Sequence, residues 1–556
     1  MQKISDTPSK YIRTLFFLSP FLTGLYYELA CTLFSAFLLV WLIIYGRSKR
    51  IILHKNFASF AVVFFFVAYL ITPLWAADHG LAWWGIAKAL PVLLFSICLI
   101  QLDCTERRSL LELLPLMGCI MTIASCVLRY IPALSDFFVI NDRLGGFFQY
   151  PNTFACFLLL CIEVSLFDER LCTWKRGLAA TMLTTGFLQA GSRAAFVIGV
   201  VALAVCFICR KDKTASLAAI IGLVAGAAVS TAVSVLTATT ATNHMLDISA
   251  QASTFLGRLL YWTDALPIIL KHPFGTGYLG YYFMQGTFQT GVYSVRWVHN
   301  DLLQILFDIG WFPAALCLIA LWRAFRSNNI TLWQKILLGT LLAHALFDFD
   351  LAYIAMFFIL LVCLDWDAGK VMVLKGKTVL SGAAVLAVAF SLWIGTSSLL
   401  TTLGRDNAAV QLYPWNTFSQ IRLLTQDTEL STFAERSNLI LRQNPYSAVA
   451  WNAKATVAWQ QGDFAEVVRA KRRAIACNKY DINEYTDYLD KLLDGVRRYR
   501  AAGQAENAQL CIEEARRIPQ SLADVKATSS SLAWKITDIP QLKLPPEYLA
   551  LLNELD

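Results

Sequence analysis

Three arginines and one histidine stand out among the residues that could do chemistry. Arg143 lies in a Gly-rich loop, Arg193 follows Gly191 and Ser192 in a short turn, and Arg258 follows a glycine in a longer connection. Guanidinium groups offer paired donors and keep their charge, which suits phosphate oxygens. His299 can take up a proton near neutral pH. These residue types fit a site where arginines hold a diphosphate leaving group and a histidine deprotonates an acceptor hydroxyl.

Other polar residues lie within or beside apolar stretches, where an unpaired charge is costly. Lys88 lies inside such a stretch, so we expect it to face an interior cavity. Asp308 is expected to serve as the partner of a buried base or as a contact between helices. Asp301 lies near the start of the apolar stretch that follows His299. A later turn contains His344, Asp348 and Asp350. We expect these residues either to hold the turn or to steady His299.

Each of these residues also has a purely structural interpretation. Arg143 and Arg193 could cap helix ends or touch lipid headgroups. Lys88 could extend its ammonium to the membrane interface, and His299 could bond a backbone carbonyl. The catalytic interpretation therefore depends on whether these side chains meet in one place.

Cysteine and histidine spacing predicts neither a metal site nor a cofactor. The chain has 14 cysteines, and twelve of them lie in or next to apolar stretches, where cysteine behaves as a small apolar residue. Cys477 and Cys511 lie elsewhere and are either free or paired with each other. No His/Cys cluster has the spacing typical of metal ligands.

The composition places much of the chain in lipid. Of the 556 residues 57% are apolar and 15% are charged, whereas a soluble domain carries about 25% charge. This excludes a disordered chain and a single soluble globule. Residues 401–556 hold 19 basic and 19 acidic residues, so the net charge of +8 belongs to residues 1–400. There the basic residues lie in short loops between apolar runs, a membrane pattern rather than a nucleic-acid-binding one.

Thirteen apolar runs predict an all-α polytopic membrane domain over residues 1–400, since a helical span needs roughly 20 apolar residues. We expect about 12–13 spans. The runs cover residues 14–27, 29–46, 56–75, 81–101, 109–131, 152–168, 177–191, 193–209, 214–236, 299–322, 336–348, 350–364 and 378–400.

Basic residues predict the orientation of these spans. Alternate loops carry 21 lysines and arginines, beginning with Lys3 and ending with Lys377, whereas the opposite loops up to residue 400 carry six. Because cytoplasmic loops are enriched in lysine and arginine, the N-terminus is expected in the cytoplasm of a multi-pass protein of the cytoplasmic membrane. A cleavable signal peptide is not expected. Thirteen crossings place residues 401–556 outside, together with a long loop at about 237–298. The three arginines and His299 then fall on this outer side.

Residues 401–556 have the pattern of a soluble helical domain. Pro445, Trp451, Gly462, Phe464 and Ala474 fall at the offsets of a helix–turn–helix repeat of tetratricopeptide type. The second half of that pattern recurs from Gly503, 41 residues after Gly462, so either a helix is longer there or an insertion intervenes. Such repeats usually bind a protein partner or order a neighbouring domain, although the tail could also simply cap the membrane part.

Several motifs in one order resemble the O-antigen ligase/polymerase family. The motifs are the run from Arg143 to Asn152, the turn from Gly191 to Ala195, the segment from Gly257 to Gly277, His299-Asn300 followed by Asp308 to Gly310, and the run from His344 to Asp350. The order, the spacing and the long loop before His299 make the resemblance fairly specific over about 140–350.

This resemblance implies a multi-span glycosyltransferase that uses an undecaprenyl-diphosphate-linked saccharide as donor. Arg193 and Arg258 would bind the diphosphate, with Arg143 and Lys88 as helpers, and His299 would be the base or would orient the acceptor. The chain departs from the family at Asp308, where glutamate is more usual, and after Arg143, where Asn-Pro-Asn is frequent.

Four functions remain open. A ligase would move the glycan onto another glycan, lipid or protein, and a polymerase would join repeat units; we favour the ligase slightly. A transporter or flippase of lipid-linked sugar should have paired halves with polar groups at mid-membrane, which this sequence lacks. An assembly scaffold would not need Lys88 or the three arginines.

Overall fold

The computed structural model describes residues 6–210, 212–237, 248–374, 377–536 and 542–555. The chain forms two compact units. The body unit contains the chain up to Ile71, Trp83–Ala250 and Val298–Leu399; the tail unit contains Thr72–Ala82, Gln251–Trp297 and the chain from Leu400 onward. Two segments before residue 400 therefore belong to the tail unit. The predicted division into a membrane domain at 1–400 and an outer domain at 401–556 remains a prediction.

Part of the sequence interpretation lies outside the described residues. This holds for the first part of the predicted long loop, 238–247, which includes His244, and for three of the basic residues used for orientation, Lys3, Lys211 and Lys375.

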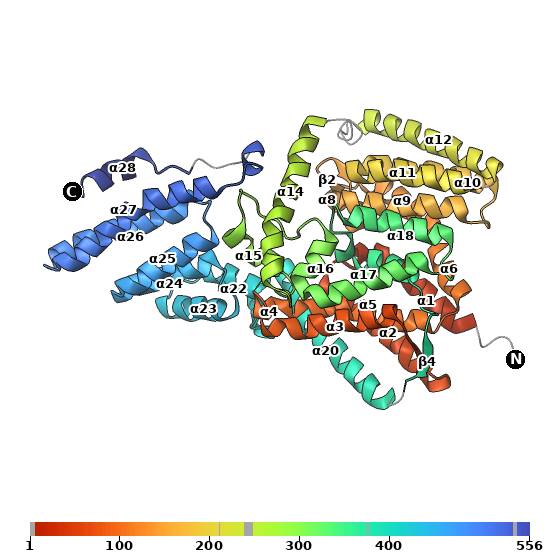
Figure 1. The fold of residues 1–556 in the computed structure, drawn as a ribbon, viewed down its shortest axis with the longest axis horizontal. Coiled ribbons are helices and arrows are strands. Elements are labelled where there is room, and N and C mark those ends of the chain that lie inside the picture. Colours follow the sequence, from red (N-terminus) through yellow and green to blue (C-terminus); the bar gives the residue numbers. More distant parts are fainter. Residues whose placement is uncertain (1–5, 211, 238–247, 375–376, 537–541, 556) are drawn as a thin grey trace. The chain divides into compact units, whose positions relative to one another are not determined.

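Helices build the body unit (Figure 1). Several lie within the predicted apolar runs, but the run at 14–27 does not form one helix: the first helix is Asp6–Leu18, and short 3₁₀ turns follow it. The helices are α1 (Asp6–Leu18), α2 (Glu28–Ser48), α3 (Phe57–Ile71), α5 (Trp84–Ile100), α6 (Cys104–Leu111), α7 (Leu114–Leu128), α8 (Pro132–Phe138), α9 (Pro151–Phe167), α10 (Thr173–Ala190), α11 (Arg193–Cys209), α12 (Lys213–Thr237), α16 (Asp301–Ile309), α17 (Trp311–Arg326), α18 (Leu332–Ala345), α19 (Ile354–Val362) and α20 (Lys377–Thr402). Short 3₁₀ turns η1 (Ser19–Phe21), η2 (Thr23–Leu25), η4 (Gly146–Phe148) and η5 (Asp350–Ala352) join some of them.

The run predicted over 299–322 is two helices. Gly310 ends α16 and begins α17 with a φ of 84°, a backbone conformation that residues with a Cβ rarely adopt. The first of them, α16, therefore has only nine residues, and His299 lies two residues before its start.

The body unit is mainly apolar, both inside and on much of its surface. Helices α5, α9 and α19 are buried nearly all round, as expected for helices at the centre of a large apolar assembly. Helices α12 and α20 instead expose large apolar side chains, such as Val224 and Leu386 at 67% and 71% of their surface. An apolar exterior of this kind is stable against lipid tails and not against water.

These features confirm an all-α polytopic membrane protein. Among the described residues, six helices are long and apolar enough to cross a membrane, and two shorter apolar helices are α9 and α11. The six are Glu28–Ser48, Phe57–Leu74, His79–Ile100, Cys104–Leu128, Lys213–Leu236 and Ser381–Thr402. The count of thirteen crossings and their orientation remain predictions.

Two small antiparallel sheets were not predicted. Strand β1 (Ile52–Lys55) pairs with β4 (Lys370–Val373), and β2 (Val139–Ile140) pairs with β3 (Arg143–Leu144). They lie in connections between apolar runs, which are too short to carry a recognisable strand pattern. The second pair fixes the backbone on both sides of the Asn141–Asp142 turn and so places Arg143.

The tail unit is also helical. Its elements are η3 (Thr72–Leu74), α4 (His79–Ala82), α14 (Ile248–Lys271), α15 (Gly280–Phe288), α21 (Asp406–Leu412), α22 (Thr417–Leu424), α23 (Leu430–Gln443), α24 (Ala448–Gln461), α25 (Phe464–Cys477), α26 (Ile482–Ala501), α27 (Ala505–Thr528), η6 (Ala533–Lys535) and α28 (Pro546–Asn553). The predicted long loop thus contains two helices, α14 and α15.

Two helical hairpins, α24–α25 and α26–α27, lie side by side in the tail unit (Figure 1). Their turns occur at Gly462 and Gly503, as the repeat pattern predicts. The 41-residue spacing arises because α26 has 20 residues, whereas α24 has 14. Their identity as tetratricopeptide repeats remains a prediction.

All 14 cysteines are free thiols, including Cys477 and Cys511. The tail unit is therefore held by packing and polar contacts. A buried cluster around Tyr485, Tyr488 and Leu489 joins α26 to α27 and α28.

The buried carboxyl of Asp78 generates a pH prediction for the tail unit. Asp78 accepts hydrogen bonds from the Leu81 amide at 2.7 Å and from Asn444 Nδ2 at 3.0 Å, and burial raises its pKa from 3.8 to about 6. The folded chain therefore binds more protons than the unfolded chain between about pH 4 and 6, so the stability contribution of Asp78 falls as pH rises through this window and stays low above it.

Thermal unfolding in detergent, followed by protease sensitivity of the tail unit, measures this effect. We expect a midpoint a few degrees higher at pH 5 than at pH 7.5 in the wild type, and a smaller difference in Asp78→Asn. An equal pH dependence in both proteins would contradict the assignment.

Candidate functional site

His299 occupies an unusual backbone position at the entrance to α16. Its φ is 56°, in the left-handed region that residues with a side chain seldom adopt. Asn300 holds this geometry from both sides: its Oδ1 caps α16 by accepting from the Leu303 amide at 3.0 Å, and its Nδ2 donates to the Leu346 carbonyl at 2.9 Å. Backbone strain that surrounding contacts maintain is typical of functional sites.

Asp348 is the partner of His299. The imidazole Nδ1 lies 3.2 Å from Asp348 Oδ1, and the side chain of Asp348 is fully buried while that of His299 is 20% exposed. A carboxylate can only accept hydrogen bonds, so an ionised Asp348 requires the proton on Nδ1. The lone pair is then on Nε2, which makes this nitrogen the basic one.

Three further donors converge on Asp348. Tyr150 donates its hydroxyl at 2.9 Å, Asn152 donates Nδ2 at 2.8 Å, and the Phe349 amide donates at 3.0 Å. A buried carboxylate is stable only when such donors replace its lost water. These contacts hold the carboxylate beside the imidazole, and the role of Asp348 in steadying His299 remains a prediction.

Arg143 is linked to the same network. One of its terminal nitrogens donates to Asn152 Oδ1 at 2.6 Å, and its Nε donates to the Ala190 carbonyl at 2.9 Å. Hydrogen bonds therefore run from the C-terminal end of α10 through Arg143, Asn152 and Asp348 to His299. Arg143 and His299 are 156 residues apart in the sequence.

Arg193 begins α11 two residues after the left-handed Gly191, and the intervening Ser192 caps the helix, its hydroxyl accepting from the Ala195 amide at 3.4 Å. Because Arg143 bonds to Ala190, the turn that carries Arg193 adjoins the Arg143 network. Arg193 is partly exposed.

Arg129 was left out of the predicted site but lies near it. It is 8% exposed at the end of α7 and donates to Gln189 Oε1 at 3.3 Å. Gln189 in turn bonds to Ser230 and Ser234 of α12. Arg129 is one of the six basic residues in the predicted outer loops, and this scarcity is the signal in the sequence.

Tyr150 and Asn152 were also not chosen as site residues. Both belong to the motif that begins at Arg143, so the motif contained the signal. Tyr150 additionally packs against Phe349, with ring centroids 4.6 Å apart, and Phe349 meets the His299 ring edge-on at 5.0 Å. This aromatic wall restricts the orientation of the imidazole.

His344 pairs with Asp350. Its Nδ1 lies 2.6 Å from Asp350 Oδ2, both side chains are fully buried, and Thr153 donates to Asp350 Oδ1 at 2.8 Å. The pair holds the turn after α18, which is one of the two predicted roles.

Cys156, His344 and Asp350 also offer ligand atoms within 4.8 Å of one another. Sequence spacing did not reveal this group, because the three residues come from two distant segments. A thiolate, an imidazole and a carboxylate are the donor types of zinc. Here the carboxylate already receives hydrogen bonds from Thr153 and His344, which accounts for the group without an ion.

Asp301 and Asp308 anchor α16. Asp301 Oδ2 accepts from the Leu351 amide at 2.9 Å and so connects α16 to η5. Asp308 accepts from Gln304 at 2.8 Å and from Tyr69 of α3 at 3.0 Å. Asp308 therefore makes a contact between helices, one of its two predicted roles.

Lys88 is 6% exposed in α5. Its ammonium donates to the carbonyls of Leu25, at 3.3 Å, and Tyr26, and it lies 5.1 Å from the centre of the Tyr26 ring. The charge is thus stabilised by carbonyl dipoles and an aromatic face. Lys88 fixes the turn between α1 and α2.

Arg258 belongs to the tail unit and lies near Tyr261, three residues further along α14. Asp264, three residues further again, fixes this helix to its surroundings. Asp264 accepts from the Thr290 amide at 2.8 Å, the Thr290 hydroxyl at 2.7 Å and Tyr293 at 3.0 Å. Burial raises the pKa of Asp264 and lowers that of nearby Lys479. These contacts hold the chain that follows α15 against α14.

Residues 177–318 match the protein family described as O-antigen ligase. The matched range includes Arg193, Arg258 and His299, but ends before Asp348. A comparison with curated proteins finds no match.

Substitutions at Asp348 test the network. Asp348→Ala leaves the donors of Tyr150, Asn152 and His299 without their shared acceptor, and we expect a loss of about 3 kcal/mol or more in unfolding free energy. Tyr150→Phe removes one donor and should cost about 1 kcal/mol. Thermal or denaturant unfolding in detergent measures both; equal losses would contradict a network centred on Asp348.

Proposed function

From the match of residues 177–318 to the O-antigen ligase family, we propose that this chain transfers a saccharide from a polyprenyl-diphosphate-linked donor to an acceptor hydroxyl. The observation that carries the proposal is the His299–Asp348 contact, a base oriented by a buried carboxylate at the entrance to a helix of the membrane body. An imidazole held in one tautomer by a carboxylate is suited to removing a proton from a hydroxyl.

The proposed transfer involves one proton transfer, one new bond and one broken bond. His299 Nε2 takes the proton of the acceptor hydroxyl, the acceptor oxygen forms a bond to the anomeric carbon, and the bond from that carbon to the diphosphate oxygen breaks. The electron pair of the broken bond leaves with the polyprenyl diphosphate, and the imidazolium later returns its proton to solvent. Asp348 stabilises the imidazolium while it exists.

The arginines would stabilise the leaving group, which gains negative charge as the bond breaks. We propose this role for Arg193 and Arg258, with Arg143 and Lys88 in support. The bonds from Arg143 to Asn152 and Ala190 favour a role in positioning, and so do the carbonyl contacts of Lys88. Many enzymes neutralise a diphosphate with a metal ion. In this proposal the positive charge of the arginines and Lys88 would take the place of the metal.

Acceptor identity separates the ligase from the polymerase. A ligase would accept a different glycan, a lipid or a protein, whereas a polymerase would accept the repeat unit itself on its own lipid carrier. We propose the ligase as the first candidate and the tail-unit hairpins as the surface for a protein partner.

Release of polyprenyl diphosphate from a polyprenyl-diphosphate oligosaccharide tests the activity. His299→Ala should reduce release by about 10²–10⁴-fold, because proton transfer is lost. Arg258→Ala and Arg193→Ala should each reduce it by about 10²-fold or more, because the charge on the leaving group loses a partner.

Two variants serve as matched controls. His272→Ala changes a histidine whose Nδ1 bonds the Ile268 carbonyl at a helix end, and Arg497→Ala changes an exposed arginine of α26. Both should keep wild-type turnover. Wild-type release by His299→Ala would refute the proposed base, and movement of the intact donor across the membrane without release would favour the transporter.

Reporter fusions test the proposed orientation. A phosphatase fused after Asp556 should be active, because that enzyme functions outside the cytoplasm, whereas one fused at Asp367, in a predicted cytoplasmic loop, should be inactive. An inactive fusion after Asp556 would contradict the predicted thirteen crossings.

A further inference from the structure

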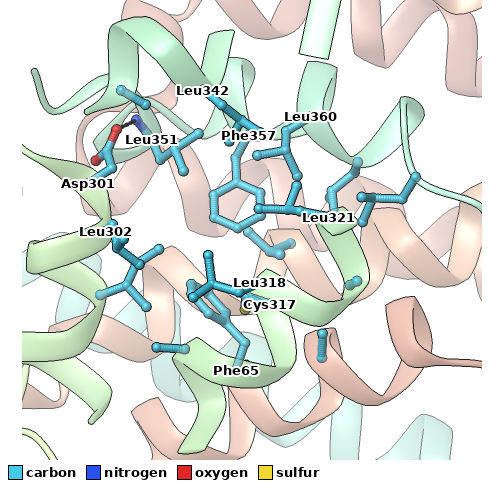
Figure 2. Close-up of a pocket in the computed structure, with 18 of the residues that line it drawn as sticks. Phe65, Asp301, Leu302, Cys317, Leu318, Leu321, Leu342, Leu351, Phe357 and Leu360 are labelled. Atoms are coloured by element: carbon cyan, nitrogen blue, oxygen red, sulfur yellow. Dashed lines mark hydrogen bonds between the residues drawn. The ribbon is translucent and has the colours of Figure 1, made fainter. Parts of the chain in front are cut away.

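The body unit contains an apolar cavity that the proposed chemistry does not use. It has a volume of about 340 Å³ and lies among α3, α16, α17, α18 and α19. Figure 2 shows Phe65, Cys317 and Leu318 on one side of it, and Leu342, Leu351 and Phe357 on the other. Among the described residues that line it, Asp301 is the one with an acidic or basic side chain.

The lining selects an aliphatic ligand. Asp301 directs Oδ2 to the Leu351 amide, so its charge is engaged at the edge of the cavity (Figure 2). A sugar or a phosphate would find almost no donors on the remaining walls, and its desolvation would be uncompensated. Apolar cavities of about 150 Å³ stay dry and bind benzene, and this one has more than twice that volume.

The cavity opens on the apolar exterior of the body unit. Two of its lining residues, Leu318 of α17 and Leu346 at the end of α18, are 48% and 44% exposed. On α17 the exposed neighbours include Phe312 and Trp322. A mouth surrounded by exposed apolar side chains is accessible to a chain dissolved in the membrane, not to a solute in water.

One end of the cavity shares residues with the His299 site. Leu346 accepts the hydrogen bond of Asn300, the residue after His299, and the turn from Leu346 to Leu351 carries Asp348. An aliphatic chain in the cavity therefore approaches the place where, by the proposed function, the sugar–diphosphate bond breaks.

We propose that this cavity binds the isoprene units adjoining the diphosphate of the polyprenyl donor. The proposal rests on the proposed function, because that function puts the diphosphate beside His299. The isoprenoid chain is joined covalently to this diphosphate, so its first units lie within reach of the cavity. A phospholipid acyl chain in the same place would bring a glycerol headgroup, instead of the reacting diphosphate, to the site.

Photolabelling tests the proposal without turnover. The probe is a polyprenyl diphosphate with a diazirine on its second isoprene unit, added to the full-length protein in phosphatidylethanolamine/phosphatidylglycerol nanodiscs. Mass spectrometry should map the label to lining residues of α17 and α18, and excess unlabelled polyprenyl diphosphate should remove it. Label confined to other helices would overturn the proposal. So would labelling of the lining by a diazirine phospholipid that polyprenyl diphosphate does not displace.

Filling the cavity provides the second measurement. Cys317→Trp and Ala345→Phe enlarge lining residues on opposite sides, and each should reduce the labelling about tenfold. Ile319→Trp is the matched control, because Ile319 is a partly exposed residue of α17 outside the lining, and it should label as the wild type does. Undiminished labelling in both filled variants would contradict the assignment, and the wild-type map decides the question if either variant fails to fold.

The two proposals can fail separately. A protein that labels in the cavity but releases no polyprenyl diphosphate from any donor would retain the isoprenoid site and lose the proposed transfer. A protein that releases polyprenyl diphosphate but labels elsewhere would retain the transfer and lose this cavity as the isoprenoid site.

Discussion

A buried carboxylate imposes the main constraint on the body unit. Asp348 has no exposed side-chain surface and receives four contacts, from Tyr150, Asn152, Phe349 and His299. In an apolar interior the loss of water from a carboxylate costs several kcal/mol, and only hydrogen-bond donors offset it. The segments that supply these donors must therefore lie in one arrangement, which holds the imidazole, the Arg143 loop and the end of α18 together.

Local backbone features make that arrangement possible. Gly310 ends α16 after nine residues, and Asn300 caps the helix while also holding Leu346. Asp301 and Asp308 secure the same short helix to η5 and α3. Hydrogen bonds therefore hold both ends of α16 in place. A cavity can exist between the apolar side chains of α16 and α17 without a change in the position of His299.

The network also explains why the candidate residues divide into two groups. Arg143, Asp348 and His299 are joined by hydrogen bonds within the body unit, whereas Lys88 and the His344–Asp350 pair hold turns. Arg258 lies in the tail unit beside Tyr261, on a helix held by Asp264. Buried polar residues in this apolar protein thus have two roles. Some fix the position of the backbone, and others orient a reactive side chain. The residue type alone does not show which role a residue has.

Sequence alone determined the features that follow from local composition. Apolar runs predicted the helices, and the α11 bounds agree with the predicted 193–209, since a helix in lipid satisfies its own backbone groups. The glycines at 462 and 503 likewise marked the tail hairpins. Tertiary structure decided which residues meet: Tyr150, Asn152 and Asp348, the strand pairs and the Cys156–His344–Asp350 group join segments far apart in the chain. Periodicity and charge describe one segment at a time, whereas a contact depends on how two segments pack, and a single sequence contains no direct record of that packing.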